Sequence, residues 1–173
     1  MRNVNVHPFD VFDALMIEII NYSTSVSSGD SCVRFLESIG VSVSEKLIEK
    51  AMKDHSRFIN ELDMVKYVCT EFWSSVYHKQ VDTLKTNYQD VYVLTVNDFQ
   101  PLLKFESVPE SMSEIPKVSL CTSLLCFQYL AFPSGLLKGA LCSLGLNCIV
   151  TAECEQLPTC KFTVTILSYR GVN

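Results

Sequence analysis

The sequence predicts an α/β domain of the α+β type, in which helices pack on one face of an antiparallel sheet. Helical periodicity dominates the first half of the chain, apolar–polar alternation marks two later strand pairs, and an uncharged run lies between those pairs. The expected order is ααα-ββ-α-ββ, which helices on one face of a sheet satisfy. The chain has no internal repeat or linker, so we predict a single domain over residues 1–173.

The first expected helix runs from Phe9 to Ile20. Its polar residues, Asp10, Asp13 and Glu18, fall within an arc of about 140°, so apolar residues fill about 220°. A helix that lies on a core needs an apolar stripe only somewhat wider than ~100°. The surplus apolar surface is covered either by two layers of the same domain or by another chain, and the width of the apolar arc favours another chain.

A polar loop is expected over residues 22–31, before a second helix from Cys32 to about Met52. Gly40 weakens the middle of this helix. Ser42 and Glu45 offer a capping-box restart there, so the segment forms either one helix or two. The third helix, Phe58 to His78, is the clearest. The residues of its core-facing side are Phe58, Leu62, Val65, Cys69, Phe72, Trp73 and Val76.

Four strands are expected. QVDTLKT and DVYVLTV (80–86 and 90–96) flank a polar turn, and NCIVTAEC and CKFTVTIL (147–154 and 160–167) form the last pair. In the fourth strand, apolar Phe162 and Val164 alternate with Lys161 and Thr163, which is typical of a half-buried antiparallel strand. Residues 104–117 contain two prolines and are expected to form a loop.

Charge and terminal patterns narrow the function. The chain has 14 basic and 19 acidic residues and a formal charge of −5, which argues against nucleic-acid binding. The first ten residues show no apolar signal segment, and neither end carries a lipidation motif. A cytosolic protein with reduced cysteines is therefore expected.

No catalytic motif is visible. The chain lacks the phosphate-loop, GxGxxG and GxSxG patterns. His7, His55 and His78 stand far apart, and none is paired with a Cys or Ser that suggests a catalytic role. We therefore expect no catalytic residue, no cofactor and no enzymatic activity.

Four cysteines recur every six residues: Cys142, Cys148, Cys154 and Cys160. Zinc sites usually contain short CxxC pairs, and this spacing has none. The four residues also fall on different expected elements. We interpret them as ordinary buried thiols, with neither a metal site nor a disulfide framework.

Several stretches together carry a family pattern. The second helix has Leu36, Glu37, Gly40, Val43, Leu47 and Glu49 at the positions of L-[DE]-x-x-G-x-x-[VI]-G-x-x-L-x-E, with Ser44 in place of the second Gly. The other stretches are RFINELDMVKYVCTEFW, KQVDTLKTNYQDVYVL, YLAFPSGLLKGALCSLG and TCKFTVTI. Over about residues 9–167, the chain resembles the small-subunit family of the transport protein particle, TRAPP, in its sixth-subunit branch.

The resemblance implies a twisted four-stranded antiparallel sheet and a non-catalytic structural role. Such subunits pair through their first two helices, with a copy of themselves or with the particle's central acylated small subunit. The particle tethers vesicles in ER-to-Golgi and Golgi transport and promotes Rab nucleotide exchange, an activity of the assembly. A cytoplasmic protein held peripherally at ER and cis-Golgi membranes is implied. The predicted interface residues are Phe9, Phe12, Met16, Ile19, Ile20, Phe35, Leu36, Ile39 and Val43.

An acyl-chain or other hydrophobic-ligand binding domain of the same fold is the alternative function. The central subunit carries its acylated cysteine just before the third helix. His55 holds that place here, so no acylation is expected.

The uncharged run from Val118 to Leu137 is long enough to cross a bilayer. Its second part instead resembles a soluble helix, in which Gly135 and Gly139 permit close approach to the sheet. Pro133 departs from the family pattern, and starts or kinks the helix. Residues 118–128 have no counterpart in the family. We interpret them as an insertion or a retained short intron that forms a surface loop or extends the last helix.

Overall fold

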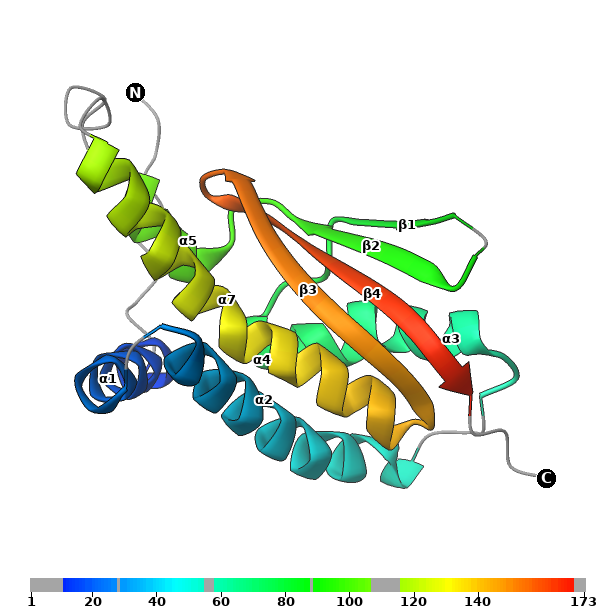
Figure 1. Cartoon of the computed structure of the whole chain (residues 1–173). Helices are drawn as coiled ribbons and strands as arrows, with labels where there is room; N and C mark the ends of the chain where they lie inside the picture. Colours follow the sequence, from blue (N-terminus) through cyan, green and yellow to red (C-terminus); the bar gives the residue numbers. More distant parts are fainter. Residues whose placement is uncertain (1–10, 28, 55–57, 88, 107–115, 170–173) are drawn as a thin grey trace, which may run out of the picture.

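The computed structural model of the chain describes residues 11–27, 29–54, 58–87, 89–106 and 116–169. The helices of the first part are α1 (Val11–Val26), α2 (Asp30–Ala51) with a 3-10 turn (Met52–Asp54), α3 (Glu61–Tyr67), a π-helical turn (Val68–Phe72) and α4 (Trp73–Tyr77). The later elements are β1 (Thr83–Thr86), β2 (Val91–Val96), α5 (Gln100–Glu106), α7 (Pro116–Ser143), β3 (Leu146–Gln156) and β4 (Thr159–Tyr169). The predicted α+β class is confirmed (Figure 1).

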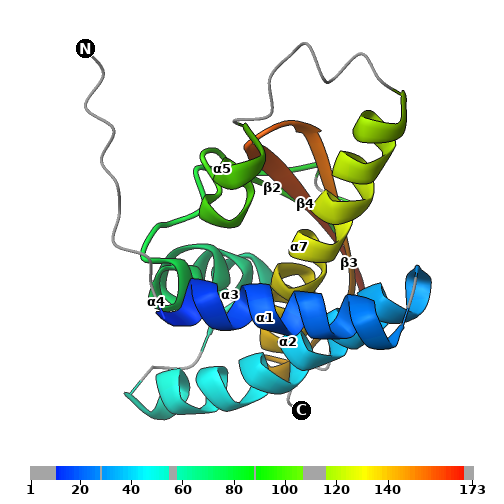
Figure 2. The ribbon, with the colours of Figure 1, turned by 90° about the vertical axis from the view of Figure 1, so that its left-hand side faces the viewer.

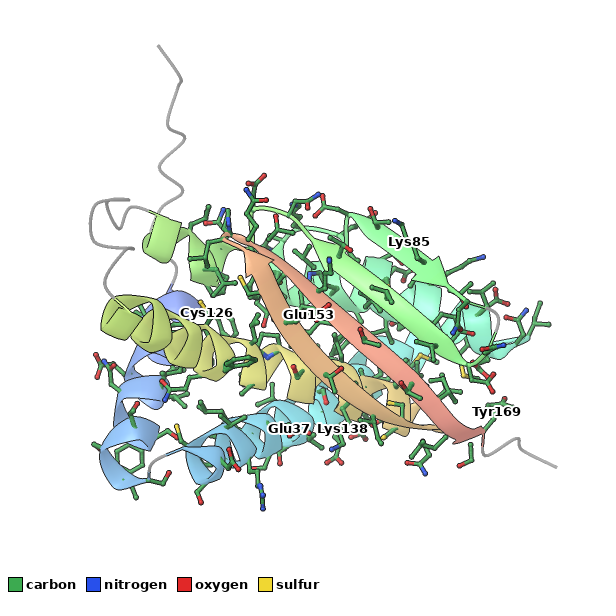
Figure 3. The ribbon with its side chains drawn as sticks, turned by 45° about the horizontal axis from the view of Figure 1, so that its top comes forward. Glu37, Lys85, Cys126, Lys138, Glu153 and Tyr169 are labelled. Atoms are coloured by element: carbon green, nitrogen blue, oxygen red, sulfur yellow. The ribbon has the colours of Figure 1, made fainter. Side chains whose placement is uncertain are left out.

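The four strands form one antiparallel sheet in the order β1-β2-β4-β3. Phe162 on the central strand β4 lies opposite Leu94 on β2 and Ala152 on β3. Phe162 and Leu94 are buried, because they point toward the helices. The other face contains the exposed side chains of Ile149 and Leu167, and none of the described helices crosses it in Figure 3.

The helices form successive layers on the inner face. The second half of α7 packs against β3, α2 packs against α7, and α1 lies outermost (Figure 2). Trp73, the only tryptophan, is buried within an aromatic cluster, 5.6 Å from Phe162 and 4.5 Å from Tyr77 between ring centroids. This cluster joins the α3–α4 segment to the sheet.

The predicted loop over residues 22–31 is wrong in its first half. α1 continues to Val26, and α2 begins at Asp30. The polar residues fit into the helix because their hydroxyls bond to carbonyls one turn earlier. Thr24 Oγ1 donates to the Ile20 carbonyl, and Ser25 Oγ donates to the Tyr22 carbonyl at 2.7 Å.

The boundaries of the next helices also differ from the predictions. α2 is continuous through Gly40, so no restart occurs in its middle. The helical segment expected from Phe58 begins at Glu61, because the Asn60 side chain accepts a hydrogen bond from the Asp63 N–H at 2.9 Å and caps it. That segment ends at Tyr77, after which His78 takes a left-handed conformation.

The predicted loop over 104–117 is shorter than expected. α5 extends to Glu106 and α7 begins at Pro116, while residues 107–115 lie outside the described part of the chain. Residues 118–128 extend α7, which is one of the two forms predicted for them. Pro133 lies inside α7 and does not start it. The origin of residues 118–128 as an insertion or retained intron stays a prediction.

Candidate interaction surface on the first two helices

The inner side of α1 is fixed to the body of the domain. Ile20 is buried, and the Phe12 ring lies 6.1 Å from Phe132 and 6.4 Å from Tyr77 between centroids. A buried contact of 3.0 Å between Ser23 Oγ and Cys32 Sγ links α1 to α2. These contacts determine which side of α1 is turned outward.

The outer side of α1 carries an apolar stripe. Leu15, Tyr22 and Val26 are separated by seven and four residues, which places them within about 40° of one another around the helix. Their side chains are 56%, 63% and 67% exposed. On α2, just beyond the turn between the helices, Phe35 is 44% exposed. We call these four residues the α1–α2 surface.

Large apolar side chains with this exposure are costly to leave in water. Burying one fully contributes about 1.5–3 kcal/mol relative to exposure. Single exposed apolar residues are common, but aligned ones on a soluble domain mark an interaction site. The α1–α2 surface is therefore a candidate site for protein association.

The structure distributes the predicted interface residues among three environments. Two were placed wrongly: Ile20 and Leu36 are 2% and 0% exposed, because they pack into the core between α1, α2 and the rest of the domain. Phe35 is exposed, so its place in an interface stays a prediction, and Phe9 lies outside the described residues. The partly buried members, which pack against the core, are Phe12, Met16, Ile19, Ile39 and Val43.

Three residues of the surface were missed. Leu15 lay within the predicted helix but was not assigned to the interface, and Tyr22 and Val26 were assigned to a loop. Their seven-and-four spacing is the signal that could have identified them. It becomes visible only when α1 is extended through its Ser and Thr residues.

Two titratable groups with raised pKa values, Tyr92 and Cys69, lie in packed surroundings. Tyr92 Oη donates to Glu61 Oε1 at 2.8 Å and ties β2 to α3. Burial, followed by this hydrogen bond, raises the pKa of Tyr92 to about 12. Burial also raises the pKa of the Cys69 thiol to about 12. Within the described part of the chain, no three His, Cys, Asp or Glu residues gather in a way that could hold a metal ion.

The predicted buried thiols are found only in part. Cys148 and Cys160 are buried, and Cys154 is half-buried, but Cys142 is exposed at the end of α7. As for a membrane span, none of the described helices combines the length and the apolar character that a crossing requires.

Comparison with known proteins identifies the class. The family described as "Transport protein particle (TRAPP) component" matches residues 12–167. The chain therefore belongs to the TRAPP component family. Its members are structural rather than catalytic subunits, which confirms the prediction of a non-enzymatic role. The match covers both helices of the candidate surface.

Two named relatives indicate the branch of the family to which the chain is similar. The chain is 41% identical over 160 residues to trafficking protein particle complex subunit 6b of Danio rerio, covering 90% of this chain and 95% of that one. It is 40% identical over 131 residues to subunit 6A of Homo sapiens, covering 76% of each. The predicted resemblance to the sixth-subunit branch is confirmed.

A solved structure shares the fold. It is trafficking protein particle complex subunit 3 from Naegleria fowleri, covalently bound to palmitic acid, with a TM-score of 0.68 and 15% identity. The alignment covers 92% of this chain and 95% of that one. At this identity the comparison supports the architecture, which is the predicted set of helices on one face of a four-stranded sheet.

Proposed function

We propose that the chain contributes a dimerisation surface, formed by α1 and α2, to a TRAPP vesicle-tethering complex. The observation that carries the proposal is the apolar stripe of Leu15, Tyr22 and Val26 on the outermost helix, together with exposed Phe35. A subunit that functions within an assembly needs such a surface, because its own core does not cover these side chains.

The partner that we propose is another TRAPP small subunit, with the central acylated small subunit first and a second copy of this chain next. Rab nucleotide exchange would then belong to the assembled complex. The complex would act in ER-to-Golgi and Golgi transport, with this chain in the cytoplasm at the surface of ER and cis-Golgi membranes. Sequence relationship to subunits 6A and 6B supports this placement.

The alternative function, binding of an acyl chain or similar apolar ligand, has less support. The described interior is occupied by close-packed rings, with Trp73 and Tyr77 at 4.5 Å and Tyr77 and Phe99 at 5.2 Å between centroids. The position that His55 holds lies outside the described residues. A fatty-acyl adduct in the mass spectrum of the purified chain would favour the alternative.

The test compares two double variants of matched exposure on opposite faces. Leu15→Glu/Tyr22→Glu alters the α1–α2 surface, whereas Ile149→Glu/Leu167→Glu alters the open face of the sheet. Phe12 is unsuitable, since its ring packs against Phe132 and its loss would disturb the fold. Pairing is measured by light scattering after gel filtration and by co-purification with the proposed partner, the central acylated small subunit.

We expect the wild-type chain to have twice its 19.5 kDa mass alone, or to form a one-to-one complex with the central acylated small subunit. The helix variant loses two buried anchors worth about 1.5–3 kcal/mol each, so its dissociation constant rises at least ~100-fold. The sheet variant pairs as wild type. A monomeric wild type with no complex, or equal pairing of the two variants, would refute the proposed surface.

A further inference from the structure

The α1–α2 surface is bordered by an acid on one helix and a base on the other. On α1, Glu18 is exposed and stands three residues after Leu15 and four before Tyr22. These spacings put Glu18 beside both apolar residues on the surface of the helix. On α2, exposed Arg34 directly precedes Phe35. One anion and one cation therefore adjoin the same apolar surface.

Neither of these charges is paired within the domain. α1 contains no Lys, Arg or His, so Glu18 has no cation beside it on its own helix. Arg34 is the only basic residue of α2 before Lys46. Among the described residues, Glu18 and Arg34 form no ion pair with each other or with any other group, and this includes Asp30, one turn before Arg34. Both charges are thus available to a partner.

The division of charge between the two helices fits a second copy of the same surface. In a dimer with two-fold symmetry, each contact between one residue and a different residue of the partner occurs twice, once in each direction. An acid on α1 and a base on α2 can therefore meet twice across one axis. Opposite charges at the rim of an interface favour the matching orientation and speed association.

The same charges disfavour the other symmetric arrangement. If α1 packed against α1 of the partner with Glu18 near the axis, two carboxylates would face each other, and neither helix has a cation to place between them. Like charges brought together at an interface cost free energy and suppress that orientation. The charges therefore favour α1 against α2 of the partner.

We propose that Glu18 and Arg34 are the specificity-determining pair of the α1–α2 surface, and that they fit this surface to a second copy of the chain. Glu18 of each copy forms an ion pair with Arg34 of the partner subunit. The inference rests on the proposed function, because it requires pairing through the α1–α2 surface. The apolar side chains supply most of the affinity, and the two charges set the orientation and select the partner.

The test reverses these charges in the full chain. Glu18→Arg gives a copy with two bases at the two positions, and Arg34→Glu gives a copy with two acids. Each variant alone then brings like charges together in both contacts. We expect its dissociation constant for self-pairing, measured by sedimentation equilibrium, to rise about tenfold at low salt.

Mixing the two single variants is the decisive step. In a mixed dimer, both contacts join an arginine to a glutamate, so the dissociation constant should return to within about threefold of the wild-type value. The double variant Glu18→Arg/Arg34→Glu should pair with itself equally well, because both of its contacts are reversed together. A variant that had lost its fold or its apolar contacts could not be rescued in this way.

Reversals of the same kind on the sheet are the matched controls. Glu153→Arg on β3 and Lys85→Glu on β1 change exposed charges outside α1 and α2 (Figure 3). Neither control should change the dissociation constant, either alone or in a mixture of the two. Higher salt should weaken wild-type pairing and strengthen the pairing of Glu18→Arg and of Arg34→Glu, because it screens attraction and repulsion alike. Circular dichroism confirms that each variant is folded.

Three results would overturn the proposal. Single variants that stay unpaired when mixed would show that Glu18 does not face Arg34 of the partner subunit. Stronger self-pairing of Glu18→Gln than of the wild type would show that two Glu18 side chains face each other. A wild-type chain that is monomeric at every concentration would exclude the second copy, whereas the proposed function would still be decided by pairing with the central acylated small subunit.

Discussion

Replacing Gly135 with alanine tests the close backbone contact where α2 and α7 cross. The nearest atoms to this glycine belong to α2 and not, as predicted, to the sheet. A Cβ atom at Gly135 would lie 2.0 Å from the Glu37 carbonyl oxygen and 2.9 Å from its carbonyl carbon. Both atoms belong to the backbone of α2, so no side chain can rotate away. The helices would have to separate by about 1.4 Å to restore an ordinary contact of 3.4 Å.

The magnitude follows from two opposing terms. Alanine is the better helix former by about 1 kcal/mol, which favours the variant. Overpacking costs about 1–3 kcal/mol and occasionally more, and the rigid neighbour places this site at the upper end. We therefore expect Gly135→Ala to reduce the free energy of unfolding by about 2 kcal/mol. That loss lowers the melting temperature by about 4–8 °C in a chain of this length.

Urea unfolding, followed by the fluorescence of buried Trp73, measures this loss. Gly139→Ala is the matched comparison, because its Cβ would meet the Ser44 hydroxyl at 2.0 Å but backbone only at 2.8 Å. Since a hydroxyl can rotate, Gly139→Ala should cost less than Gly135→Ala. Equal or increased stability of Gly135→Ala would show that the backbones of α2 and α7 do not meet at Gly135.

Three further outcomes are expected. Tyr92→Phe removes the hydrogen bond to Glu61 and should cost about 1 kcal/mol in urea unfolding; an unchanged midpoint would contradict the link between β2 and α3. Because burial raises the pKa of the Cys69 thiol from 9.0 to about 12, its contribution to the free energy of unfolding is fully present below pH 9.0 and should be lost as the pH rises toward 12. Cys69→Val should reduce this loss of stability at high pH. Glu37→Gln should change stability by less than about 1 kcal/mol, because the bridge to Lys138 is partly exposed; a larger effect would indicate a less solvated pair.

Much of the fold could be predicted because local patterns and long-range packing agree. The alternation of Phe162 and Val164 with polar residues identified the inner face of β4. The second half of α1 was predicted wrongly as a loop, because Ser and Thr favour loops on average. Here Thr24 and Ser25 bond to their own helix, and local propensity does not show that choice.

The candidate surface was harder to predict than the fold. The width of the apolar arc on the first helix indicated a partner. It could not show which side of the helix faces the partner and which faces the core. Which side is covered depends on contacts distant in sequence, such as Phe12 with Phe132. For the same reason, Ile20 and Leu36 were assigned to an interface although both are buried, on helices that pack against each other and, for α2, against α7. Periodicity identifies an apolar side but does not identify what covers it.

The crossing of α2 and α7 also bears on how the α1–α2 surface would bind. A Cβ at Gly40 would lie 2.3 Å from the Phe132 carbonyl oxygen, so glycines on both helices permit backbone contact. Such a contact leaves few side chains between the helices to rearrange. α2 is therefore a stiff support. The contact between Ser23 and Cys32 joins α1 to it, and the Phe12 ring packs against Phe132 on α7. A surface ordered before binding loses less conformational entropy when a partner covers it. The small residues at a buried crossing thus contribute to association at a surface they do not touch.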